Sequence, residues 1–158
     1  MLKIVLAAVL LVLCAYIGFA VERFYKTRLR MLEEYSEFVR YAKRETEFLK
    51  TDLVALLTSF ECCAELKEAF TAAAALVKEG KPVEISGKYL TDKAFAEIRA
   101  FLAAMSEADY YGKNAVLKHA EEVAAELTAK AGKDKIQKGE LIRKLMILLG
   151  VGLVVLTI

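Results

Sequence analysis

Two stretches without a charged side chain, one near each end of the chain, constrain the fold most strongly. Residues 4–21 read IVLAAVLLVLCAYIGFAV, and residues 145–158 read LMILLGVGLVVLTI. An α-helix rises about 1.5 Å per residue, so the first stretch spans about 27 Å, which is close to the hydrocarbon thickness of a bilayer. We therefore predict a transmembrane anchor over residues 1–21.

The second stretch reaches a similar length when the residues before it are counted. The long side chains of Arg143 and Lys144 can carry their charges to the membrane surface while the helix continues into the bilayer. A helix that starts at residue 141 then spans about 27 Å, which predicts a transmembrane helix over 141–158. Gly150 and Gly152 are candidates for close packing against another membrane helix.

Basic residues flank both stretches on the side of the middle segment. Arg23, Lys26, Arg28 and Arg30 follow the first stretch, and Lys133, Lys135 and Lys138 precede the second. Because loops rich in Lys and Arg stay in the cytoplasm, residues 22–140 should be cytoplasmic, with Arg23, Arg143 and Lys144 at the membrane boundary.

Two other interpretations of the apolar stretches remain open. The first stretch could be a cleaved signal peptide, since Gly18 and Ala20 are small residues near a possible cleavage site; the basic residues that follow it argue against this. Either stretch could instead be a buried core helix, although the lack of any charge argues for a membrane.

The middle segment has the pattern of packed helices. It contains one proline, Pro82, and no glycine before Gly80. Apolar residues recur in steps of three and four, a helical stripe, at Leu32, Tyr35, Val39, Ala42, Leu49, Leu53, Leu56 and Phe60, with Thr46 in the one gap. Residues 80–90 form the main predicted loop. We expect an all-α fold.

Polar residues mark the expected helix starts. Thr51 and Asp52 could begin a helix, and Thr58 with Glu61 fits a capping box. Thr91 or Asp92 should cap the next helix, and Asp109 the one after that. Gly132 and Gly139 should interrupt or bend the last helix before the second apolar stretch.

Candidates for chemistry are few. Cys62 and Cys63 are adjacent and should be reduced in the cytoplasm, and His119 is the only histidine, without the spacing of a zinc site. No phosphate-binding loop occurs. The net charge of +2 argues against a nucleic-acid partner. We expect no catalytic residue, cofactor, metal or small-molecule substrate.

The chain resembles the stage III sporulation protein AB family. The family ends in an apolar helix with the pattern Leu-Tyr-Arg-x-Leu-Gly-x-Leu-x-Gly-Leu, and the matching residues here are Leu141, Arg143, Leu145, Leu148 and Gly150. Glu45-Thr46-Glu47 matches a Glu-Thr-Glu element, and Asp109 with Leu117 matches a Leu-Gly-x-Ser-Asp-x-x-x-Gln-x-x-x-Leu motif. Lys113 stands where the family prefers Gln. Glu45, Glu47, Asp109 and Lys113 are therefore candidate partner-facing positions.

The resemblance implies a role in endospore formation. Family members resemble the cytoplasmic F domain of type II secretion platforms, a compact bundle of about six helices. They are thought to work in the mother cell membrane that faces the forespore, within a secretion-like channel complex. The implied partners are its ATPase, stage III sporulation protein AA, other proteins of the complex and membrane lipid.

The leading hypothesis is a non-enzymatic platform or assembly subunit of that channel. One alternative is a membrane-anchored adaptor or sensor that forms a homo-oligomer, a parallel dimer, through its first cytoplasmic helix, whose stripe runs from Leu32 to Phe60. Another is an enzyme that uses Cys62, Cys63 or His119, with or without a metal.

Overall fold

The computed structural model describes residues 2–49 and 51–157. For residues 2–4, 48–49, 110 and 156–157 it describes the backbone but not the side chain. Leu49 of the predicted stripe and Ile158 at the end of the second apolar stretch therefore fall outside the described side chains.

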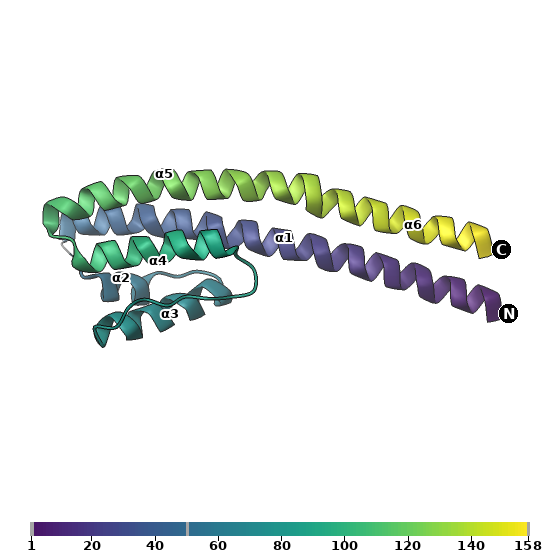
Figure 1. Cartoon of the computed structure of the whole chain (residues 1–158), viewed down its shortest axis with the longest axis horizontal. Coiled ribbons are helices and arrows are strands. Elements are labelled where there is room, and N and C mark those ends of the chain that lie inside the picture. Colours follow the sequence, from purple (N-terminus) through teal and green to yellow (C-terminus); the bar gives the residue numbers. More distant parts are fainter. Residues whose placement is uncertain (1, 50, 158) are drawn as a thin grey trace. The chain divides into compact units, whose positions relative to one another are not determined.

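The described residues are helical except for short connections, and they contain no strand, so the all-α prediction is confirmed. The helices are α1 (Leu2–Leu49), α2 (Leu53–Ser59), α3 (Ala64–Lys78), α4 (Asp92–Glu107), α5 (Tyr110–Asp134), a π-helix η1 (Lys135–Glu140) and α6 (Leu141–Thr157) (Figure 1).

The chain divides into two compact units. Unit 1 consists of residues 1–29 and 130–158, and unit 2 of residues 30–129. Unit 2 holds five helical segments, where the resemblance implied a bundle of about six: the second part of α1, then α2, α3 and α4, and the first part of α5.

Phe38 of α1 lies at the centre of the core of unit 2 and is fully buried. Its ring centroid is 4.5 Å from that of Phe70 on α3, 5.3 Å from that of Phe60 after α2, and 6.5 Å from that of Phe101 on α4. One aromatic side chain thus joins three helices and a connecting segment.

The predicted stripe on α1 faces this core. Leu32, Tyr35, Val39, Ala42 and Thr46 are each at most 2% exposed. The chain's own helices cover this face of α1. The parallel dimer of the adaptor hypothesis would need the same face as its interface, and that face is already buried within one chain.

Two predicted caps are confirmed. The hydroxyl of Thr91 accepts a hydrogen bond from the amide of Ala94 at the start of α4. A carboxylate oxygen of Asp109 accepts one at 2.8 Å from the amide of Gly112 in the first turn of α5.

The predicted capping box at Thr58 and Glu61 is wrong. Thr58 lies in the last turn of α2, where its hydroxyl donates to the carbonyl of Val54, and α3 begins only at Ala64. The start of α3 is held from elsewhere in the chain: the carboxylate of Glu34 on α1 accepts a 2.6 Å hydrogen bond from the amide of Cys63.

The predicted loop after α3 begins at a glycine. Gly80 has a φ of 66°, a conformation that L side chains rarely adopt. The amide of Lys81 donates a hydrogen bond to the carbonyl of Leu76, and the amide of Gly80 donates one to the carbonyl of Val77. These two bonds end α3 in a Schellman motif.

The helix from Tyr110 onward changes pitch near Gly139, and not at Gly132, which lies inside α5. Buried residues follow steps of three and four at Leu117, Ala120, Ala124, Leu127, Ala131 and Asp134, and the next buried residue, Gly139, comes five positions later. The π-helix η1 contains this step. Its wider turn keeps the same side of the helix buried before and after it.

We predict that Phe38→Ala will destabilise unit 2 by about 3–5 kcal/mol, because it leaves a cavity at the centre of the core. The midpoint of thermal unfolding of the full chain in detergent, followed by circular dichroism, measures this. Tyr111→Ala is the control, since Tyr111 is 83% exposed. A change at Phe38 no larger than at Tyr111 would contradict the central role of this ring.

Candidate functional site

A buried ion pair joins the two apolar helices of unit 1. Glu22, the first charged residue after the apolar stretch of α1, is 5% exposed. Its carboxylate accepts a hydrogen bond at 2.7 Å from the guanidinium of Arg143, and Lys26 lies 3.1 Å from the same carboxylate. The charged residue that ends the apolar stretch of α1 therefore lies level with the charged residues that precede the apolar stretch of α6.

Small residues let these helices approach closely. A Cβ added at Gly18 would lie 3.3 Å from the Cα of Arg143, and one at Gly150 would lie 3.2 Å from the Cβ of Cys14. Since Cys14 meets residue 150 and Gly18 meets residue 143, α1 and α6 run antiparallel. The beginning of α1 and the end of α6 lie at the same end of unit 1 (Figure 1).

Gly152, the other predicted packing glycine, does not touch α1. Apart from its chain neighbours and the nearby backbone of α6, no atom of the described residues lies within 4 Å of a Cβ built there. Gly150 and Gly152 therefore lie on different faces of α6, with Gly152 on an exposed one.

A second charged cluster lies beside the π-helix. Asp134 is 9% exposed and sits 2.9 Å from Lys138 and 3.7 Å from Arg28 of α1. The hydrogen bond from Lys138 holds the pKa of the Asp134 carboxyl below its ordinary value, more than burial raises it. Gly139 lets Tyr25 pack nearby, since an added Cβ would lie 3.2 Å from the Cβ of Tyr25.

The predicted boundary residues occupy different environments. Arg23 and Lys144 are exposed, whereas Arg143 is half-buried, paired with Glu22 and 6.0 Å from the centre of the Phe19 ring.

The apolar parts of both helices are exposed. Of the eighteen large apolar side chains that are exposed among the described residues, sixteen lie between Val5 and Phe19 of α1 or between Leu141 and Val155 of α6. By length and composition, one helix of the described residues is apolar enough to cross a membrane: α1, with a mean hydropathy of 2.4 over its best window, of which 22% is buried.

The predicted partner-facing positions Glu45 and Glu47 lie near the end of α1. Glu45 accepts a 3.4 Å hydrogen bond from the hydroxyl of Thr51. Glu47 is exposed and lines a surface hollow of about 510 Å³ that also includes Arg44 and the ion pair of Lys43 with Glu121 (2.7 Å).

Asp109 and Lys113 lie at the start of α5, and neither is among the residues that line that hollow. The side chain of Asp109 caps α5, and its carbonyl accepts a 3.0 Å hydrogen bond from the amide of Lys113. The motif leucine, Leu117, is fully buried. The motif residues therefore have structural roles: Asp109 caps the start of α5, and Leu117 packs in the core.

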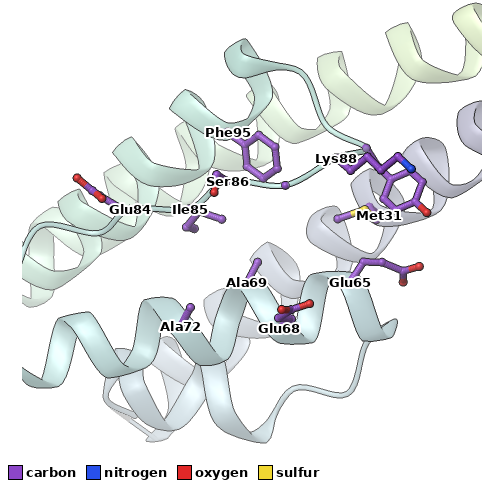
Figure 2. Close-up of a pocket in the computed structure, with 12 residues that line it drawn as sticks. Met31, Glu65, Glu68, Ala69, Ala72, Glu84, Ile85, Ser86, Lys88 and Phe95 are labelled. Carbon is purple, nitrogen blue, oxygen red and sulfur yellow. The ribbon is translucent and has the colours of Figure 1, made fainter.

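An acidic hollow of about 360 Å³ lies between α3, α4, the segment after α3 and the part of α1 near Met31 (Figure 2). Its apolar floor consists of Met31, Ile85 and Phe95, each at most 5% exposed. Exposed carboxylates surround it at Glu65, Glu68 and Glu84, and Lys88 is the one basic residue among its described lining residues. This hollow suits a partner that presents an apolar side chain next to basic ones.

The cysteines do not have the environment of reactive thiols. Cys63 is buried, and its pKa is raised to about 11 by burial and by the hydrogen bond with the Glu34 carboxylate. Burial also raises the pKa of Cys62. His119 is exposed beside a small apolar hollow, and the described residues hold no group of three or more side chains that could bind a metal ion.

The family comparison covers nearly all of this structure. A family model described as stage III sporulation protein AB matches residues 3–158. The chain belongs to the stage III sporulation protein AB family. Comparisons with curated proteins and with solved structures gave no match.

Membership confirms the resemblance and makes this a sporulation-related protein. The stage III sporulation protein AB pattern in α6 divides between two faces. Arg143 and Gly150 face α1, and Leu141, Leu145 and Leu148 are 52–69% exposed.

Sequence reasoning missed two carboxylates that hold the chain together. Glu22 pairs with a residue 121 positions away, and Glu34 binds the start of a helix 29 positions away. For Glu22 a signal existed, because an acid at the end of one apolar stretch and an arginine at the start of the other suggest a pair. For Glu34, one of many charges on α1, there was none.

We predict that Gly150→Cys will form a disulfide with the native Cys14, because the two Cβ atoms would lie close to the separation that a disulfide needs. Gly152→Cys is the matched control and should not cross-link. Both variants are made with Cys62→Ser and Cys63→Ser, and mass spectrometry of oxidised peptides gives the result. Cross-linking of both variants, or of neither, would contradict the register of α1 and α6.

We predict that alkylation of Cys63 by iodoacetamide will become about tenfold faster per pH unit up to a pH near 11, because only the thiolate reacts. The measurement uses the full chain with Cys14→Ser and Cys62→Ser. Glu34→Gln removes the negative charge that opposes ionisation, so it should shift the profile to lower pH. A plateau near pH 9.0, the ordinary value, would contradict the effect of burial and of Glu34.

Proposed function

We propose that this protein is a non-enzymatic membrane platform or assembly subunit of the secretion-like channel complex between mother cell and forespore. We further propose that it works with the cytoplasmic ATPase of that complex, stage III sporulation protein AA. The observation that carries the proposal is the antiparallel pairing of two exposed apolar helices whose apolar parts end at the same level. Family membership supplies the link to sporulation.

The helix pair supports two membrane spans. Sixteen exposed large apolar side chains on α1 and α6 are far more than a single helix pair leaves open to water in a soluble protein. In a bilayer these side chains would contact lipid. The glycine contacts and the Glu22–Arg143 pair are interactions of the kind that hold helices together where no hydrophobic effect acts between them.

The orientation follows from the basic residues. Unit 2 lies in sequence between the two spans, so both of its ends meet the membrane from one side. The positive charges that flank the spans favour the cytoplasm for that side, because loops rich in Lys and Arg tend to stay there. Our proposal therefore locates the protein in the mother cell membrane, also called the outer forespore membrane, with unit 2 in the cytoplasm.

We infer that the acidic hollow of Figure 2 is the surface of unit 2 that receives a protein partner. A buried apolar floor inside a ring of carboxylates offers both hydrophobic contact and charge pairing, the usual combination at a binding hot spot. The raised thiol pKa of Cys63 makes a cysteine nucleophile a poor alternative at ordinary pH, which supports a role in assembly over one in catalysis.

We predict that deletion of the gene in a spore-forming bacterium will arrest development after engulfment, and that the full-length chain will restore spore yield. The variant Glu65→Lys/Glu68→Lys should fail to restore it, because it reverses two charges at the acidic hollow. The matched control Glu122→Lys/Glu126→Lys reverses two exposed charges of α5 outside the hollow and should restore it.

Co-purification of the full chain with the ATPase separates the two parts of this proposal. Loss of the ATPase with the hollow variant but not with the control supports docking at the hollow. Equal recovery with both variants would remove the hollow as the docking site and leave the platform role. Normal spore yield in the deletion strain would overturn the platform role itself.

A further inference from the structure

Charge is distributed very unevenly between the two units. Unit 1 contains ten basic and three acidic residues, a net charge of +7, whereas unit 2 contains thirteen basic and eighteen acidic residues, a net charge of −5. The overall charge of +2 therefore hides a strongly basic unit 1. Such an asymmetry is typical of chains that bind an anionic surface with one part.

The basic residues of unit 1 form a collar next to the apolar surfaces. We define the basic collar as Arg23, Lys26, Lys135, Lys138 and Lys144. The ion pairs of Glu22 with Arg143 and of Arg28 with Asp134 bring the two helices into register, so the collar residues of both helices lie on the same side of the apolar parts. Along the helix axis they lie within about 12 Å of the level of Arg143.

The three acidic residues of unit 1 pair with only two of the five collar residues. Glu22 is buried and binds Lys26 of the collar and Arg143, and Asp134 is buried and binds Lys138 of the collar and Arg28. Glu140, half-buried, is the third. Among the collar residues Arg23, Lys135 and Lys144 form no ion pair within the part of the chain that the structure describes, so their charges remain available to a partner.

We propose that the basic collar binds the headgroups of anionic phospholipids in the bilayer that surrounds α1 and α6. This inference rests on the proposed membrane insertion of unit 1. Basic residues immediately beside a transmembrane helix lie at the depth of the lipid phosphates, where each one attracts anionic lipid. The phosphate diester of a lipid with a net negative charge fits the collar, whereas a zwitterionic headgroup brings its own cation.

The location of the collar favours lipid over a soluble anion. The exposed apolar side chains of α1 and α6 begin next to the collar, so a ligand with acyl chains contacts both surfaces at once. A soluble phosphate would meet only the charged side chains, which are spread over two helices.

The experiment compares spin-labelled phosphatidylglycerol with spin-labelled phosphatidylcholine around the full chain in phosphatidylcholine vesicles. Electron paramagnetic resonance measures the fraction of each lipid whose motion the protein restricts. We expect phosphatidylglycerol to associate about fivefold more strongly, the factor that one basic residue beside an anionic surface supplies. Raising the salt concentration from about 0.01 M to about 1 M should reduce this preference, because the screening length falls from about 30 Å to about 3 Å.

Three variants locate the effect. Arg23→Gln/Lys135→Gln/Lys144→Gln should remove most of the preference. The charge-conserving Arg23→Lys/Lys135→Arg/Lys144→Arg should keep it. Lys78→Gln/Lys93→Gln/Lys118→Gln, which neutralises three basic residues of unit 2, is the matched control and should also keep it.

Each other outcome overturns the inference. Equal association of both lipids, with a motionally restricted population present for each, would overturn the collar as a lipid site and leave the membrane anchor intact. No restricted population for either lipid would overturn the anchor as well. Loss of the preference on replacing chloride with inorganic phosphate at constant ionic strength would assign the collar to a soluble anion.

Discussion

The close antiparallel approach of α1 and α6 sets the register on which the arrangement of unit 1 depends. Gly18 and Gly150 remove the side chains that would keep the helices apart, and Glu22 and Arg143 fix how far one helix slides along the other. A shift of one helical turn would separate this pair and leave the buried Glu22 carboxylate with Lys26 of its own helix but without its 2.7 Å hydrogen bond from Arg143, which is costly for a buried charge. The register therefore has one strongly favoured value.

That register also explains the π-helix. Buried residues on α5 are three or four positions apart, but Asp134 and Gly139 are five apart. In a regular α-helix this longer step would rotate Gly139 and the residues after it away from the buried face. The wider turn of η1 absorbs the additional residue. Asp134 can then pair with Arg28 while Gly139 packs against Tyr25 and Arg143 reaches Glu22.

The two units have opposite net charge and different surfaces, so they suit different kinds of partner. Unit 1 exposes apolar helices beside basic residues, the chemistry of a bilayer and its surface. Unit 2 covers its aromatic core with its own helices and exposes an acidic hollow with an apolar floor, the chemistry of a protein partner. This division is what the proposed platform role requires, with unit 1 for the membrane and unit 2 for the partner.

Local signals in the sequence determined the helical class, the apolar stretches, the buried stripe of α1, the main loop at residues 80–90 and the caps at Thr91 and Asp109. These features depend on the spacing of apolar side chains along the chain and on hydrogen bonds between residues close in sequence. The sequence alone is therefore enough to predict them. Only the tertiary structure decided that Phe38 is the centre of the core, that Glu34 and not Thr58 holds the start of α3, that Gly150 packs on α1 while Gly152 does not, and that the carboxylates around the hollow come together. Each of these results depends on contacts between distant segments. No local pattern encodes them, because many surface carboxylates and helix positions look alike until packing selects one.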